Sequence, residues 1–182
     1  MAGAAPLRER MQALRVVSAL PSRRARGSPL PLQALFARLA RAPGARDADE
    51  IEERIWACWM SDANADAEGA LDRATSDIAA RRYDIAETRL ARLVRARGDF
   101  AEAWHKLGVL YWILGRDAES MRAMQRALER EPRHFAALGT VGEILDGAGD
   151  REGAALAFWT ALRLHPHMGS ARERLAEVRA SR

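Results

Sequence analysis

Residues 101–134 read AEAWHKLGVLYWILGRDAESMRAMQRALEREPRH, and residues 135–168 repeat their pattern in register. Seven positions of the first stretch correspond to similar residues 34 positions later. The pairs are Trp104 with Leu138, Leu107 with Val141, Gly108 with Gly142, Tyr111 with Leu145, Gly115 with Gly149, Ala127 with Ala161 and Pro132 with Pro166. A fixed period of this size is typical of arrays of stacked helical pairs. We therefore expect two consecutive helix–turn–helix units.

Each unit contains the signals for two closely packed helices. Apolar residues recur at spacings of three and four, which places them on one helical face. Gly115 and Gly149 stand where the first helix of each unit should end, because glycine accepts the left-handed conformation common at helix C-termini. Pro132 and Pro166 end the second helices, because proline disfavours a helical conformation of the residue before it. Local chemistry and period therefore predict the same boundaries.

The order Trp-x-x-Leu-Gly-x-x-Tyr, then Ala-x-x-x-Phe, then Pro is the signature of the tetratricopeptide repeat, which the first unit resembles. The first unit departs from it at Ser120 and Met124, whereas the second has Ala154 and Phe158 at those places. The resemblance implies an all-α fold, a short right-handed α-solenoid of helix–turn–helix repeats. It is highly specific for fold and weakly specific for function.

A wider set of residues is similar to a family of small tetratricopeptide-repeat proteins from alphaproteobacteria, with relatives in plant and algal organelles. The residues that carry this resemblance are Leu35-Phe36-x-Arg38-Leu39, Ile51-x-x-x-Ile55-Trp56-x-x-Trp59, Asp99-Phe100-Ala101-Glu102-x-Trp104 and Glu131-Pro132-Arg133-His134-Phe135-x-Ala137-Leu138. The resemblance covers about residues 32–168 and implies no catalytic activity. Bacterial members generally carry a secretory leader, which residues 1–30 do not match, so the resemblance favours an organellar relative.

The remaining residues divide around the two units. Residues 31–61 predict an N-terminal helical hairpin broken at Pro43 and Gly44, which could cap the array. Its charged first turn and its stripe of Ile51, Ile55 and Trp59 favour a core role over a recognition motif. Residues 67–100 predict a degenerate repeat, with Arg73 and Asp77 where later units have Leu107 and Tyr111, so its first helix packs differently or the register slips by one. Residues 169–182 predict a C-terminal capping helix.

The net charge of +4 is unevenly distributed over the 182 residues. Residues 1–46 contain nine Arg and one acid, a net charge of +8, which leaves −4 for the remainder. Residues 1–30 are Arg-rich and acid-poor, which fits a transit peptide for a chloroplast or mitochondrion. The alternatives are an untargeted, disordered tail in the cytoplasm of a bacterium and a misassigned start codon with Met11 as the true start. Because the repeats are mildly acidic, the charge argues against nucleic-acid binding by the repeat region.

The sequence contains no recognisable catalytic site. It has no Gly-rich phosphate loop, nucleophile elbow or paired-carboxylate motif. The pair His165 and His167 lacks a third zinc ligand, and Cys58, the only cysteine, cannot form an internal disulfide. No apolar run approaches the roughly 20 residues of a membrane-spanning helix. We therefore expect no enzymatic activity, no metal, no cofactor, no small-molecule substrate and no transmembrane segment.

In tetratricopeptide-repeat arrays the first helices line a concave surface where ligands usually lie. By spacing, the face of these helices not used for core packing carries six candidate partner-binding residues: Glu102, His105, Val109, Trp112, Glu143 and Asp146. Trp112 either anchors a ligand or packs against the preceding repeat, and Trp159 on an outer helix is a second candidate for which packing is favoured. The carboxylates predict a ligand with basic residues and an apolar anchor.

Three functions are compatible with these patterns. The first is a non-catalytic protein–protein interaction adaptor or scaffold that binds a protein, peptide or helix in the concave groove, for example as an assembly factor. The second is an RNA-binding helical-repeat protein, which would need a basic concave face. The third is membrane-surface association through the basic N-terminus, for which a clean amphipathic helix with a Lys/Arg face is missing. We rank the adaptor first.

Overall fold

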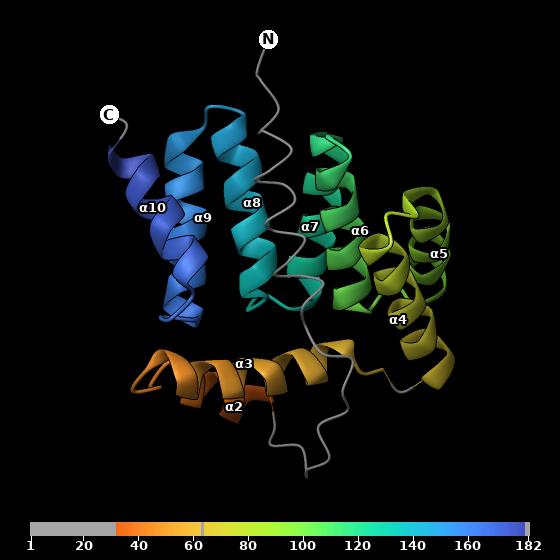
Figure 1. Cartoon of the computed structure of the whole chain (residues 1–182), viewed down its shortest axis with the longest axis horizontal. Coiled ribbons are helices and arrows are strands. Elements are labelled where there is room, and N and C mark those ends of the chain that lie inside the picture. The colour runs from red at the N-terminus through yellow and green to blue at the C-terminus, as the bar shows by residue number, and fades with distance from the viewer. Residues whose placement is uncertain (1–31, 63, 181–182) are drawn as a thin grey trace. The chain divides into compact units, whose positions relative to one another are not determined.

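The computed structural model describes residues 32–62 and 64–180, and the regular elements in these ranges are all α-helices (Figure 1). The all-α class predicted from the repeats is thereby confirmed. The helices are α2 (Leu32–Leu39), α3 (Ala45–Met60), α4 (Ala65–Ala79), α5 (Tyr83–Ala96), α6 (Ala101–Ile113), α7 (Asp117–Arg130), α8 (Phe135–Gly147), α9 (Arg151–Leu164) and α10 (Gly169–Ala180). Among them, no helix combines the length and the apolar character needed to span a bilayer. The interpretations placed on residues 1–30 lie outside the described ranges.

The backbone repeats the 34-residue period at the turns that join the two helices of each pair. Gly115 and Gly149 have φ values of 74° and 83°, as the sequence predicts for glycines that follow a helix. Arg81 stands one period earlier, between α4 and α5, and has a φ of 58°. The degenerate repeat therefore keeps the left-handed turn of the other two, although it lacks the glycine that favours this conformation.

The helices of each repeat approach closely at a second pair of glycines. A Cβ added to Gly108 of α6 would lie 2.8 Å from the terminal methyl of Met124 on α7. A Cβ added to Gly142 of α8 would lie 2.6–2.8 Å from three ring carbons of Phe158 on α9. Gly142 therefore needs to be glycine for its two helices to reach their observed separation, whereas at Gly108 the flexible end of Met124 can give way.

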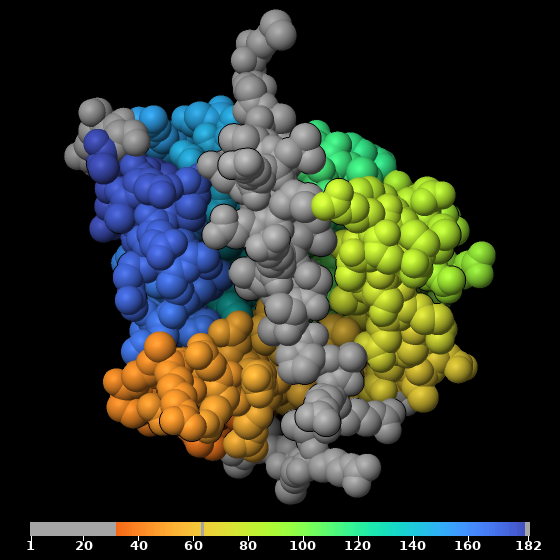
Figure 2. All heavy atoms as spheres, viewed as in Figure 1, coloured from red at the N-terminus to blue at the C-terminus, as the bar shows by residue number. Residues whose placement is uncertain are grey.

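The described residues divide into two compact units, of which one contains α4 to α7. Its core is formed by side chains from α4, α5 and α6, and includes Leu71, Leu90 and Leu107. The atoms of α4 and α5 form a continuous surface on the side shown in Figure 2. Arg73 of α4 is exposed, whereas Asp77 is buried and paired with Arg82 and Arg89 at 2.7 and 2.8 Å. The polar residues that make this repeat degenerate thus remain solvated or paired.

The other unit contains α2, most of α3, and α8 to α10. Its aromatic centre is Phe135, whose ring lies edge-on to Phe36 of α2 and Trp56 of α3 at centroid distances of 6.3 and 6.2 Å. Glu52 of α3 also bonds His165 Nε2 at 2.7 Å, across 113 residues of sequence. The N-terminal helices therefore pack on the second repeat, although the sequence had suggested a cap that precedes the array.

Candidate functional site

Four of the six residues predicted to face a groove lie in the protein interior. Glu102 and His105 of α6 are 0% exposed, Val109 is 1% and Trp112 is 3% exposed. None of them can contact a partner in this conformation. Their spacing in the sequence identifies a shared helix face, but it does not reveal how much of that face other side chains cover. Of the two interpretations of Trp112, burial favours packing.

The polar residues on this buried face are paired with one another. One oxygen of Glu102 lies 3.1 Å from His105 Nδ1 and 3.1 Å from Lys106 Nζ. Lys106 is 1% exposed. Spacings of three and four on one helix bring the three groups together, and pairing reduces the large free-energy cost of burying a charge. The cluster is internal to α6 and presents no reactive group to solvent.

Glu143 and Asp146 of α8 are half-buried and share a partner from the same unit. Arg174 of α10 places Nε 3.0 Å from Glu143 and Nη2 2.7 Å from Asp146. A third contact joins Arg174 to Glu177. The sequence predicted that a basic ligand would pair with these two carboxylates. In the structure, Arg174 of the C-terminal helix pairs with them instead.

The described residues instead form an open pocket of about 490 Å³ on α6 and α7. Signature residues of α6 form its apolar wall, and charged or polar residues of α7 form its rim. The lining comprises Trp104, Leu107, Tyr111, Glu119, Arg122, Ala123, Gln125, Arg126 and Glu129. Sequence reasoning missed this pocket because it assigned the signature residues to the core. The signal available was the run of charged residues at helical spacing on α7.

Arginines hold both aromatic rings of the pocket. The indole N–H of Trp104 donates to the Gly98 carbonyl at 3.0 Å, and Arg130 donates to the same carbonyl. The guanidinium carbon of Arg130 lies 5.9 Å from the centre of the Trp104 ring. The guanidinium of Arg116 lies 4.4 Å from the centre of the Tyr111 ring. Cation–π contacts of this kind stabilise the orientation of a ring. The apolar wall is therefore preorganised.

The carboxylates of the rim are engaged within this unit. Arg116 donates to both Glu119 and Glu87, and its hydrogen bond lowers the pKa of Glu119. Hydrogen bonds from Gln125 and then from the neighbouring arginines lower the pKa of Glu129. Arg122 is exposed on the same rim, next to Glu119. Because both acids stay ionised and paired, Arg122 is the rim charge best placed to meet a ligand.

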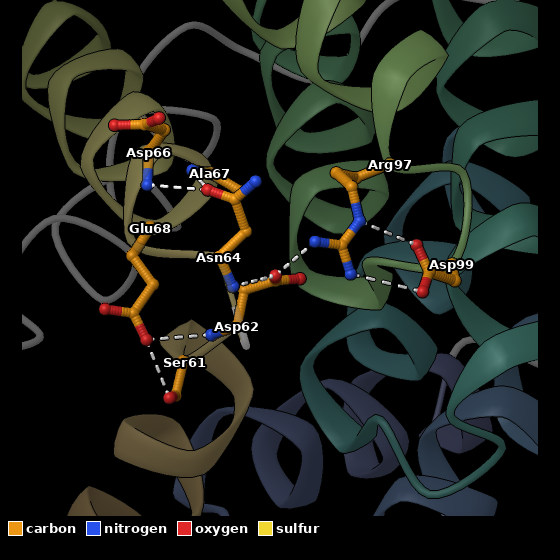
Figure 3. Close-up of polar contacts among 8 residues, drawn as sticks. All are labelled: Ser61, Asp62, Asn64, Asp66, Ala67, Glu68, Arg97 and Asp99. Carbon is orange, nitrogen blue, oxygen red and sulfur yellow. Dashed lines mark hydrogen bonds and ion pairs between the residues drawn. The ribbon is translucent and has the colours of Figure 1, made fainter.

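The loop that carries Gly98 is fixed by the polar network in Figure 3. Arg97 donates to Asp62 at 2.5 Å and to Asp99 at 3.3 Å. Gly98 lies between Arg97 and Asp99, so these contacts fix both of its neighbours in the chain. The same network starts α4. Asn64 accepts from the backbone N–H groups of the first turn, as an N-cap residue does, while Glu68 accepts from Ser61 Oγ at 2.7 Å. These contacts position the carbonyl to which Trp104 binds.

Comparisons with known proteins agree with this architecture. Residues 101–134 match the family model described as "Tetratricopeptide repeat". A curated TPR repeat-containing protein of Rhizobium etli is 28% identical over 144 residues, which cover 79% of this chain and 71% of that protein. The match to an alphaproteobacterial protein agrees with the wider resemblance described above.

Solved structures show the same fold at low identity. The Yersinia enterocolitica type III secretion chaperone SycD, in complex with a peptide of the translocator YopD, has a TM-score of 0.60 at 12% identity, covering 66% of this chain and 98% of that chain. MamA has a TM-score of 0.59 at 16% identity, covering 82% and 79%. A type III secretion complex from Aeromonas hydrophila has a TM-score of 0.56 at 17% identity, covering 82% and 92%. Likeness at these identities concerns the fold alone.

Proposed function

Given that this chain carries a tetratricopeptide repeat and folds as proteins with that repeat do, we propose that it is a non-catalytic adaptor that binds another protein. The contact surface in this proposal is the pocket on α6 and α7. The observation that carries it is the open, preorganised apolar wall formed by Trp104, Leu107 and Tyr111. The partner would be one component of a larger assembly that the adaptor holds during assembly.

The chemistry of the pocket defines the class of ligand. Its volume of about 490 Å³ accommodates a side chain together with part of its backbone, and lies in the usual range of about 300–1,000 Å³ for ligand pockets. An apolar side chain would contact Trp104 and Tyr111. A carboxylate next to it would pair with Arg122. We therefore propose a peptide segment with an apolar anchor and a neighbouring acidic residue, in place of the basic ligand expected from the sequence.

The fold relative SycD supports a peptide as the ligand class. It was solved with a peptide of the translocator YopD, so a chain with this fold accommodates a segment of another protein. The half-buried aromatic rings of the pocket and its arginines agree with the residue types enriched at protein interfaces. Both observations favour a protein segment as the ligand. RNA is less favoured, because the pocket rim carries as many carboxylates as guanidinium groups and so has no excess positive charge.

A site-specific photocrosslink tests this proposal in source cells. A photoreactive amino acid at Gln125, on the pocket rim, should give a discrete crosslinked protein whose attached peptide contains an apolar residue beside Asp or Glu. The same probe at Arg92, exposed on α5, is the matched control and should not capture this peptide. Crosslinks from Gln125 to RNA, or to no defined protein, would overturn the proposal.

A charge reversal on the rim provides a second readout. Arg122→Glu should reduce the yield of the Gln125 crosslink, because the new carboxylate repels an acidic ligand. Arg92→Glu makes the same change of charge on another helix and should leave the yield unchanged. Equal yields in the two variants would contradict the assigned role of Arg122. Circular dichroism of both variants establishes that the helices are intact.

A further inference from the structure

A second surface on α9 is independent of the pocket. Two large apolar side chains of this helix face solvent, since Leu156 is 62% exposed and Trp159 is 43% exposed. The opposite face of α9 is buried through Ala154 and Phe158, among others. The guanidinium carbon of Arg163 lies 5.0 Å from the centre of the Trp159 ring. A tryptophan beside a leucine on one exposed face is a candidate contact surface, because tryptophan is enriched among the anchors of interfaces.

The exposed face of α9 has a charged residue at each end. Glu152, Leu156, Trp159 and Arg163 are all exposed and follow the spacing i, i+4, i+7 and i+11. With 3.6 residues per turn, these four side chains fall within about 60° of one another around the helix. The stripe therefore reads acid, apolar, apolar, base from its N-terminal to its C-terminal end. We call these four residues the α9 stripe.

The order of residues in the α9 stripe is self-complementary. Leu156 and Trp159 are equally far from the midpoint between residues 157 and 158, and so are Glu152 and Arg163. If two copies of α9 pack antiparallel about a two-fold axis at this midpoint, Leu156 of each copy faces Trp159 of the other. Glu152 of each copy then faces Arg163 of the other. We propose that the α9 stripe binds a second copy of this chain in this antiparallel arrangement.

Two-fold symmetry doubles every contact of the α9 stripe. An isologous interface uses the same patch on both subunits, so each Leu–Trp contact and each Glu–Arg pair occurs twice. A parallel arrangement would instead place like charges opposite each other at both ends. A crossing angle of about +20°, one of the preferred classes of helix packing, keeps the facing residues of the two stripes in contact along the helices. Apolar contact and charge pattern thus select the same partner and the same orientation.

A charge-swap experiment on the full chain tests this arrangement. Sedimentation equilibrium over a series of concentrations should show a monomer–dimer equilibrium for the unmodified protein. Glu152→Arg places two guanidinium groups opposite each other and should weaken dimerisation about tenfold or more. Arg163→Glu should weaken it similarly. The double variant Glu152→Arg with Arg163→Glu restores both pairs with reversed polarity and should recover most of the affinity.

Further variants separate the interface from folding. Trp159→Ala should weaken the dimer by about thirtyfold, since tryptophan is a frequent anchor of interfaces. Arg179→Glu, an exposed charge reversal on α10, is the matched control and should leave the dimer unchanged. The proposal is overturned if the unmodified chain stays monomeric at its highest soluble concentration. It is also overturned if the double variant is weaker than both single variants.

Discussion

Replacing the glycine at the crossing of α8 and α9 should distort the second repeat more than the same change distorts the first. In Gly142→Ala the new methyl group would lie 2.6 Å from a ring carbon of Phe158, and two more ring carbons lie within 2.8 Å. The ring of Phe158 is rigid and 1% exposed, so it cannot move aside without shifting the helix. In Gly108→Ala the close atom is the terminal methyl of Met124, which can rotate away.

The size of the difference follows from two opposing effects. Alanine stabilises a helix interior over glycine by about 1 kcal/mol. Overpacking of a rigid core site destabilises by about 1–3 kcal/mol. Because the Phe158 ring is rigid, the overpacking cost of Gly142→Ala should lie in the upper part of this range, at about 2–3 kcal/mol. The expected net loss in the free energy of unfolding is then about 1–2 kcal/mol, which for a chain of this size lowers Tm by about 2–8 °C. For Gly108→Ala the two effects nearly cancel, and the change should stay within about 1 kcal/mol.

The assay is thermal and urea unfolding followed by circular dichroism, with Gly108→Ala as the matched control. A second change tests the cause. Phe158→Met in the Gly142→Ala background gives the second repeat the flexible side chain that the first repeat has at Met124, and should reduce the penalty. The reasoning is refuted if the two alanine variants lose equal stability, or if Phe158→Met increases the loss in the Gly142→Ala background.

Two further substitutions should change the stability of the fold in a direction that the structure defines. Arg81→Gly should raise the free energy of unfolding by about 0.5–1 kcal/mol in urea titrations, because the left-handed conformation is strained for arginine; Gly115→Ala, at the equivalent turn, should lower it. Burial raises the pKa of Glu52, but hydrogen bonds from His165 and Trp56 outweigh this effect and hold the pKa below 4.5. A lowered pKa means that Glu52 stabilises the fold above that pH and that the contribution is lost as the pH falls further. In Glu52→Gln the unfolding midpoint should therefore depend less on pH below 4.5, and an unchanged pH profile would contradict the assignment.

The sequence predicted the features that depend on neighbouring residues. The glycines and prolines of the two clear repeats predicted where helices end, because their conformational preferences act within a few residues. The structure, and not the sequence analysis, locates the left-handed turn of the degenerate repeat at Arg81, one period before Gly115. Local preference argues against a left-handed arginine, and tertiary packing overrides that preference.

Features that depend on distant residues were missed. Nothing in the spacing of α3 indicates that Glu52 bonds His165, because a contact across 113 residues leaves no periodic signal. The expected binding role of Glu102 and Trp112 failed for a related reason, since a helical period identifies a face and not what covers it. The pocket lined by Trp104 and Tyr111 was missed for the reverse reason. The residues of the repeat signature were assigned to the core, although these two are only partly buried.

The buried cluster on α6 has a consequence for the reactivity of the protein. Lys106 is the only lysine in the sequence, and its amino group is bonded to Glu102 in the interior. Acylating reagents and enzymes that modify lysine side chains have no accessible lysine target while α6 stays folded. The rate at which Lys106 is acylated therefore measures how often this repeat opens, without any label or engineered probe.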